Sequence, residues 1–316
     1  MLDRALALRE WAAQRLATLV NLDSPSGDGP LIRAVTDQLA DGFARLGGRI
    51  ARDGDHLVCR WPGPGDGHVL LVGHADTVFP VGTAARRPFH LDGDTLRGPG
   101  VHDMKGALVA VELALRLIHG QPLRRPVRLV IVADEEIGSP DGQRVVAAQS
   151  VGAVAALGLE PPLPGGALKI GRRGVARVRL AVRGVAAHSG LDADAGVSAI
   201  DELVDQLSLL RGAFPSCATL NVGAIAGGAK ANVIAAAAEA ELGLRFADQT
   251  EERRVFEALA GLAPVRPGAR LDVTRLSHRP AWPEDPTNPL AAELREIAAG
   301  LGLRLSAGTS GGAGDT

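Results

Sequence analysis

Cysteine is scarce in this chain of 316 residues, which has only Cys59 and Cys217, far apart in the sequence. A framework of disulfide bonds is therefore excluded, and we expect both thiols to be reduced and buried. A strong charge of either sign is also absent, because the formal net charge is −2. This balance argues against nucleic acid as a partner, and the cysteine usage fits a cytoplasmic protein.

Long apolar runs are absent as well, since none approaches the ~18 residues that a membrane helix needs. Arg9, Glu10 and Arg15 interrupt any apolar core that a secretory signal would require. Hydrophobic residues make up 46% of the chain, which is typical of globular proteins, and the length predicts two domains. The sequence thus predicts a globular cytoplasmic protein without a membrane partner.

Helix and strand patterns alternate in the first half of the chain. Short apolar runs bounded by turn residues, typical of buried parallel strands, occupy 69–72, 127–132 and 154–159. Apolar side chains at helical spacing predict helices at 8–19, 32–46 and roughly 104–118. Such alternation predicts an α/β fold, with a mostly parallel sheet covered by helices on both faces.

The pattern changes after Gly174. Val178, Leu180 and Val182 alternate with polar residues, as in a strand with one buried and one solvated face. A helix, two strands, a helix and a strand are then expected at 200–210, 218–225, 232–246, 251–262 and 270–275. The resulting order β-α-β-β-α-β is that of a ferredoxin-like unit.

We predict that this unit is a domain inserted into the first one. The inserted domain would comprise 175–278, and the first domain would comprise 1–174 together with 279–316. The segment His278 to Pro289 contains four prolines and is predicted to be the linker that leads back to the first domain.

Acidic and imidazole side chains follow each of the three apolar runs. His74 and Asp76 follow the first, Glu135 and Glu136 the second, and Glu160 the third. Ligands bind in open α/β sheets beyond the carboxyl ends of the strands. Several carboxylates gathered there repel one another unless they are protonated or neutralised by cations. A metal site is therefore predicted at this edge of the sheet.

Each of these motifs, taken alone, also has a simpler explanation. His74 and Asp76 share one side of a strand, where a carboxylate commonly holds the second ring nitrogen of a metal-binding histidine, but a surface pair fits equally. Asp103 precedes a predicted helix and fits either a helix N-cap or a carboxylate that bridges two cations. Glu135 and Glu136 fit a metal ligand beside a proton acceptor, or two acids on a surface loop.

Together the motifs resemble a known family. The segments 73–80, 98–106, 134–139 and 159–161 are similar to those of the M20 family of di-zinc metallopeptidases. This family includes glutamate carboxypeptidases, acetylornithine deacetylase, succinyl-diaminopimelate desuccinylase and aminoacylases. The order and spacing match over nearly the whole chain. The resemblance implies a zinc-exopeptidase-like catalytic domain with an inserted ferredoxin-like lid that serves dimerisation.

The resemblance also implies roles for individual residues. Two zinc ions per subunit, with cobalt or manganese as alternatives, would be held by His74, Asp103, Glu136 and Glu160. Asp103 would bridge the two ions, and Asp76 would orient His74. Glu135 would be the general acid/base, which takes a proton from the attacking water and returns it to the leaving amine.

In the lid, the resemblance points to residues that contact substrate. The segment 187–190 resembles the loop whose histidine, here His188, reaches the active site of the partner subunit and binds the oxyanion. Asn232 and Arg245 lie in segments that resemble those gripping a substrate carboxylate. Arg172, near the domain junction, is expected to be solvated, with contact to substrate as the alternative. A homodimer formed through the lid follows from the same resemblance.

The C-terminal end departs from the family pattern. The family takes its last zinc ligand from a histidine well downstream of a glycine-rich segment, and 310–316 resembles only the start of that segment. We therefore expect this chain to be a C-terminally truncated copy of a longer enzyme. His102, where the family usually has a small residue, is a milder departure.

The predicted function is hydrolysis of an amide bond next to a free carboxylate in a small peptide or N-acyl amino acid. The sequence of 73–80 favours a carboxypeptidase that releases a C-terminal amino acid, as glutamate carboxypeptidases do. Two alternatives stay open. One is an N-acyl-amino-acid deacylase, and the other is an inactive metal-binding fragment that lacks the last histidine ligand.

Overall fold

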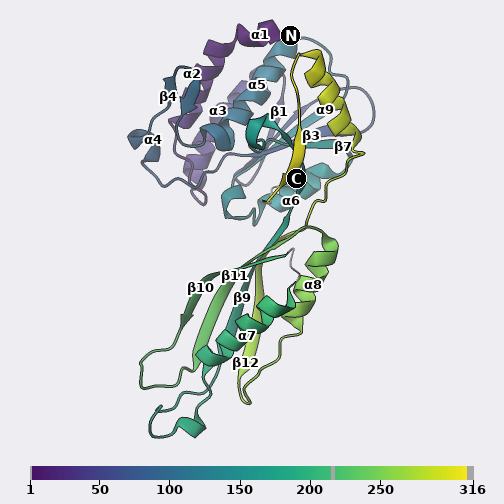
Figure 1. Ribbon diagram of the computed structural model, residues 1–316. Coiled ribbons are helices and arrows are strands. Elements are labelled where there is room, and N and C mark those ends of the chain that lie inside the picture. Colours follow the sequence, from purple (N-terminus) through teal and green to yellow (C-terminus); the bar gives the residue numbers. More distant parts are fainter. Residues whose placement is uncertain (1, 215–217, 312–316) are drawn as a thin grey trace. The chain divides into compact units, whose positions relative to one another are not determined.

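The computed structural model describes residues 2–214 and 218–311, and these divide into two compact units. Unit 1 holds the described residues up to Pro162 together with Gly300–Leu303. Unit 2 holds Leu163–Ala299 and the stretch that begins at Arg304. Figure 1 labels the elements of both units. The division into 1–174, 175–278 and 279–316 stays a prediction.

Unit 1 is built on a sheet of five strands in the order β1-β2-β6-β3-β7. Their bounds are β1 Arg49–Asp53, β2 His56–Trp61, β3 His68–His74, β6 Val127–Val132 and β7 Ala153–Gly158. Strands β6, β3 and β7 run parallel, whereas β1 and β2 are antiparallel to their neighbours. The expected α/β fold with parallel central strands is confirmed.

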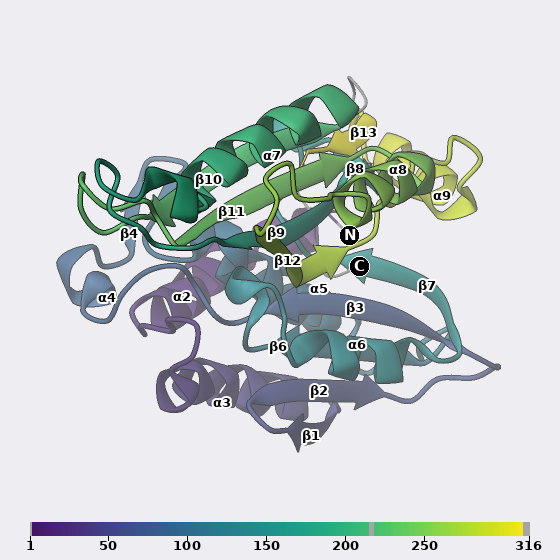
Figure 2. The ribbon, with the colours of Figure 1, turned by 90° about the horizontal axis from the view of Figure 1, so that it is seen from below.

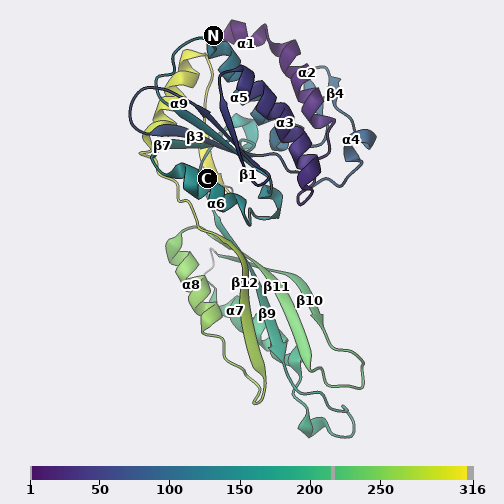
Figure 3. The ribbon, with the colours of Figure 1, turned by 180° about the vertical axis from the view of Figure 1, so that it is seen from behind.

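Helices cover both faces of this sheet. Those that pack on it are α2 Arg9–Val20, α3 Gly29–Arg45, α5 Gly106–Ile118 and α6 Gly142–Ser150, and the unit also has the short helices α1 Leu2–Leu6 and α4 Thr83–Arg86. Leu129 and Ile131 of β6 pack in one buried cluster with residues of α2, α3 and α5. Val130 and Val132 point the other way and pack with Val145 of α6. This alternation follows from the period of two along a strand, and Figure 3 shows α3 and α5 side by side. A small hairpin, β4 His90–Asp92 with β5 Thr95–Arg97, completes the unit.

Unit 2 has the predicted order β-α-β-β-α-β. Its elements are β9 Gly174–Arg183, α7 Ala199–Ala213, β10 Thr219–Gly227, β11 Ala237–Phe246, α8 Gln249–Ala260 and β12 Arg270–Arg279. The sheet is antiparallel, with the order β10-β11-β9-β12, so that β10 and β12 are its edges. Helix α7 lies along β11 and β9, as Figure 2 shows. The ferredoxin-like order is therefore confirmed.

One face of this sheet carries the core of unit 2. Val178, Leu180 and Val182 of β9 are buried against α7 and α8, whereas Arg179 and Arg183 are exposed on the opposite face. The amphipathic pattern in the sequence thus fixes which face the two helices cover. Outside this sheet, β8 Leu168–Arg172 pairs in parallel with β13 Ala307–Ser310, and α9 spans Pro289–Gly300.

Two smaller expectations have an outcome here. The predicted linker began at His278, but the structure places that residue in β12, where its ring contacts the Glu252 carboxylate at 2.7 Å. Cys59 is a free, buried thiol as expected, and burial raises its pKa to about 12. Cys217 lies outside the described residues. In the part of the chain that the structure describes, no helix combines the length and the apolar character that crossing a bilayer requires.

Candidate metal centre

The ends of three parallel strands gather the predicted site residues. His74 closes β3 beside Val132, the last residue of β6, and a short 3₁₀ turn, Glu135–Ile137, follows β6. The amide of Leu159 donates to the Val72 carbonyl at 2.8 Å, so the pairing of β7 with β3 continues to the residue just before Glu160. Because these strands run in the same direction, their carboxyl ends meet at one edge of the sheet.

The His74 ring is held through both of its nitrogens. Nδ1 lies 2.9 Å from the main-chain carbonyl of Asp76, and Nε2 lies 3.0 Å from Oδ1 of Asp103. Because a carbonyl only accepts, Nδ1 carries a proton, and Nε2 is the nitrogen at which a cation would replace the second proton of the charged ring. Burial opposes a charge on the ring, but the carboxylates of Asp103 and Asp76 outweigh it and raise the pKa of His74 to about 11.

Asp76 is fully buried and connects the histidine to the acidic pair. Its carboxylate accepts hydrogen bonds from the Ser26 hydroxyl at 2.6 Å and from the amides of Glu135 and Glu136, each at 3.1 Å. Burial favours the neutral acid, but the bonds from His74 and Ser26 prevail and lower the pKa of Asp76. Asp76 thus contacts the His74 ring through its carbonyl at 2.9 Å and its Oδ1 at 3.4 Å, while the carboxylate also fixes the backbone of the acidic pair.

Two overlapping groups of side chains converge on His74. One joins it to Asp103 and Glu136, the other to Glu135 and Glu160, and within each group the candidate ligand atoms lie within 4.8 Å of one another. Burial raises the pKa of Glu136, and the neighbouring carboxylates of Asp103 and Glu160 add to the rise. One imidazole nitrogen with several carboxylate oxygens is a donor set that zinc accepts. A cation would also relieve the repulsion among the acids, so the residues present fit a metal centre.

The segment that carries Asp103 is anchored on both sides. Helix α5 begins at Gly106 and its N-cap is Lys105, so the N-cap explanation for Asp103 is wrong. The Lys105 ammonium is buried and donates to the Leu22 carbonyl at 2.8 Å. The amide of His74 lies 3.2 Å from the Met104 sulfur. These contacts hold the Asp103 carboxylate beside the His74 ring.

The predicted substrate-binding residues belong to unit 2. The amide of Ser189 donates to the Asn232 carbonyl at 3.1 Å, which brings the His188 loop beside the segment that carries Asn232. The ring of His188 is exposed, and its Nδ1 accepts from the Gly190 amide at 3.2 Å. Arg245 is exposed on β11. The roles of His188, Asn232 and Arg245 stay predictions.

Three expectations about single residues and segments had a different outcome or were not made from the sequence. Ser26 was missed, because only the fold brings it to Asp76, fifty positions along the chain. Arg172 was expected to be solvated, but its exposed fraction is 5% and its backbone pairs with Trp282. Of the glycine-rich segment 310–316, only the first two residues lie among those that the structure describes.

The chain is similar to several known proteins. A family model described as a peptidase dimerisation domain matches residues 170–266. Carboxypeptidase G2 of a Pseudomonas species is 31% identical over 200 residues, which cover 60% of this chain and 48% of that protein. The chain thus spans about half the length of this relative. A succinyl-diaminopimelate desuccinylase of Cereibacter sphaeroides is 32% identical over 294 residues, which cover 84% of this chain and 77% of that protein.

The chain belongs to the M20 peptidase family. Among solved structures, an M20 family metallo-carboxypeptidase of Sulfolobus solfataricus superposes with a TM-score of 0.74 at 15% identity. The alignment covers 96% of this chain and 87% of that one. At this level of identity the likeness shows that the M20 fold is shared.

Proposed function

We propose that this M20 protein is a metal-dependent hydrolase that cleaves an amide bond next to a free carboxylate. The observation that carries the proposal is the convergence of two acidic groups on one buried histidine, His74, at the carboxyl edge of the sheet. A surface cluster of acids needs neither a buried imidazole nor a buried carboxylate beneath it. Asp76 supplies that second buried group.

In this proposal the metal ligands are His74, Asp103, Glu136 and Glu160, and the ions are zinc, with cobalt or manganese as alternatives. Cations bound there would polarise the scissile carbonyl and acidify the attacking water. Glu135 accepts the proton of that water and returns it to the leaving amine. Asp76 holds the amide of Glu135 at 3.1 Å, which keeps this carboxylate beside the ligands.

The residues of unit 2 complete the proposal. Arg245 and Asn232 bind the substrate carboxylate, for which the planar guanidinium of arginine is suited. His188, from the partner subunit of a homodimer, donates a hydrogen bond to the oxygen that becomes negative. The match to a peptidase dimerisation domain at 170–266 supports a homodimer formed through this unit.

A carboxypeptidase that releases a C-terminal amino acid is the favoured activity, and N-acyl-amino-acid deacylation is the second candidate. The likeness to carboxypeptidase G2 supports the first. The longer alignment with a succinyl-diaminopimelate desuccinylase supports the second. A metal-binding protein without turnover is the third outcome that an experiment must distinguish.

The experiment compares peptidyl-glutamate with N-acetyl and N-succinyl amino acids, before and after chelation and re-addition of zinc, cobalt or manganese. We expect hydrolysis that chelation abolishes and a metal restores. Glu135→Gln should lower kcat by about 10²–10⁴-fold while metal content stays unchanged. Glu257→Gln, on the exposed side of α8, is the matched control. Hydrolysis that survives complete metal removal contradicts the proposal, as does bound metal without turnover of any substrate.

A further inference from the structure

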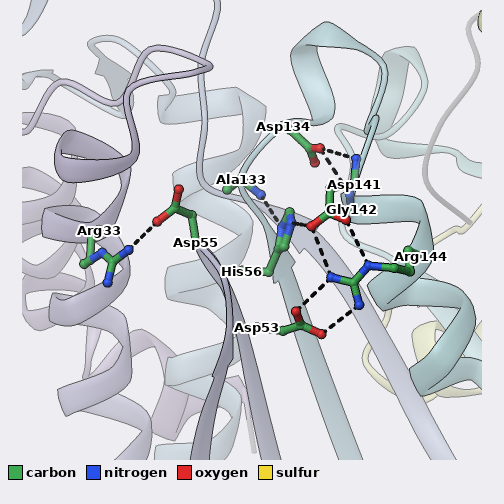
Figure 4. Close-up of polar contacts among 9 residues, drawn as sticks. All are labelled: Arg33, Asp53, Asp55, His56, Ala133, Asp134, Asp141, Gly142 and Arg144. Carbon is green, nitrogen blue, oxygen red and sulfur yellow. Dashed lines mark hydrogen bonds and ion pairs between the residues drawn. The ribbon is translucent and has the colours of Figure 1, made fainter.

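The loop 133–141 joins β6 to α6 and carries Glu135 and Glu136. A second buried histidine, His56, lies at the base of this loop. It is the first residue of β2, which runs antiparallel to β6, so it sits beside the end of β6. Its exposed fraction is 4%. The amide of Ala133, two residues before Glu135, donates to Nδ1 of His56 at 3.1 Å. On the other side of the ring, Nε2 lies 3.1 Å from Oδ2 of Asp141 (Figure 4).

These two contacts determine which ring nitrogen carries the proton. A backbone amide only donates, so Nδ1 of His56 must be the acceptor and Nε2 must bear the hydrogen. Nε2 then donates to the Asp141 carboxylate. The neutral ring therefore joins two ends of the loop. One is the amide of Ala133, where the chain leaves β6, and the other is Asp141, the residue just before α6.

The far end of this bridge is itself fixed. Arg144 donates to Asp141 from Nε at 2.9 Å and holds both carboxylate oxygens of Asp53, at 2.8 and 3.0 Å (Figure 4). The Arg144 hydrogen bond and, after it, the bond from His56 lower the pKa of Asp141 to about 2. Asp141 is thus an ionised, anchored acceptor for His56, tied to the end of β1 through Arg144.

Asp134 makes a second set of hydrogen bonds between the two ends of the loop. Oδ2 of Asp134 accepts from the amides of Asp141 and Gly142 at 2.8 and 3.1 Å. A side chain at Gly142 would place its Cβ against Oδ1 of Asp134. The amide of Ser139 also returns to the Asp134 carbonyl at 2.8 Å. The loop is therefore held at its base, and Glu135 and Glu136 lie on the part between these anchors.

We propose that His56 is a positioning residue for Glu135 and Glu136: its ring fixes the amide of Ala133 against Asp141 and thereby sets the path of the chain into the acidic pair. The inference rests on the proposed hydrolase function. Among the described residues, the ring of His56 makes its hydrogen bonds with Ala133 and Asp141 and not with a predicted ligand, so it acts through the backbone. Its loss should leave substrate binding intact and disturb the placement of the proton-transferring carboxylate.

The test compares His56→Phe, which keeps a ring without nitrogens, with His56→Asn, whose Oδ1 takes the place of Nδ1 as the acceptor for Ala133. His68 provides the matched control. It is buried at the start of β3, at the opposite end of that strand from His74, and its Nε2 lies 2.9 Å from the Gln149 carbonyl. Its Phe and Asn variants are measured in parallel. The readouts are kcat, KM, metal content and hydrogen exchange of the amides of 133–142.

For His56→Phe we expect kcat to fall by about 10–100-fold with KM within about twofold, because small misplacements of a reacting group have costs of this size. Exchange of 133–142 should be faster in that variant, and His56→Asn should recover most of both quantities. The His68 variants should leave both unchanged. The proposal is overturned if folded His56→Phe keeps its kcat, if exchange in 133–142 is unaltered, or if Asn restores nothing. If the wild type hydrolyses none of the substrates, the proposed function fails, and hydrogen exchange still decides whether His56 orders the loop.

Discussion

At the scale of single residues, Asp76 links the predicted metal ligand His74 to the acidic pair. Nδ1 of His74 lies 2.9 Å from the main-chain carbonyl of Asp76 and 3.4 Å from its Oδ1, and the carboxylate also accepts from the amides of Glu135 and Glu136. A carboxylate suits this position because both of its oxygens only accept. One buried anion can therefore fix the ring and the backbone of the acidic pair together.

Replacement of Asp76 by Asn tests this double role. The Asn side chain has one accepting oxygen, and its amino group would face backbone donors, so we expect zinc affinity to fall by about 10–100-fold. Ser26→Ala removes only one donor and should change the affinity by no more than about threefold. Competition with a zinc-binding dye measures both variants. Equal affinities of Asp76→Asn and the wild type would contradict the role given to this carboxylate.

The sequence predicted only those site residues that local spacing along the chain can identify. His74, Glu135, Glu136 and Glu160 follow apolar runs, so their arrival at one edge could be expected from strand direction alone. Ser26 and His56 carry no such signal, because each meets its partner only through the tertiary fold. The contact of His74 with a main-chain carbonyl was also beyond reach, since a motif names side chains and not backbone atoms.

At the scale of elements, the antiparallel sheet of unit 2 was the easier part to predict. Alternation along β9 identifies its buried face directly. β1 was missed because its five residues, Arg49–Asp53, carry two arginines and an aspartate and pair along only one side, with β2. Burial of an edge strand is too weak to impose an apolar pattern. The edge strand of the sheet in unit 1 was therefore not predicted.

Glu202 of α7 shows how an element is joined to a loop by a buried charge. Its carboxylate is inaccessible to solvent and accepts from the amides of Val265 and Arg266, at 2.9 and 2.8 Å, and from the Gln206 side chain at 2.7 Å. Burial opposes ionisation, but the bond from Gln206 and the two amides outweigh it and lower the pKa of Glu202. The charged form is therefore the one that stabilises unit 2.

This depressed pKa predicts a stability difference that depends on pH. Above the ordinary pKa of glutamate, about 4.3, Glu202→Gln should lower the free energy of unfolding by about 1.5–3 kcal/mol. As pH falls through the lower folded pKa, wild-type Glu202 is protonated too, and the difference should disappear. Urea titrations followed by circular dichroism at pH 7 and in acid measure it, with Glu257→Gln as the exposed control. A difference that persists unchanged in acid would refute the ionised role.

At the scale of the whole molecule, the two edges of the unit 2 sheet, β10 and β12, differ in how well they suit a dimer interface. The residues matched by the dimerisation-domain model, 170–266, include β10 but end before β12 begins at Arg270. On β10, Ile225 is a large apolar side chain with an exposed fraction of 62%, compared with 38% for Val273 and 42% for Leu276 on β12. An unpaired edge strand that also exposes apolar surface is suited to pairing with a second copy. We therefore expect β10, not β12, to form the dimer.

Lysine at one edge or the other separates these alternatives. The wild type should have a mass in solution of about 65 kDa, twice the 32.6 kDa of one chain. Ile225→Lys brings two like charges together across a two-fold axis, so its dimer dissociation constant should rise by about tenfold or more. Val273→Lys makes the same change on β12, at a residue 38% exposed, and should leave the dimer intact. Sedimentation over a range of concentrations measures all three proteins. A dimer lost in Val273→Lys but kept in Ile225→Lys would place the interface on β12. The partner's His188 would then have to act from a dimer formed through that edge.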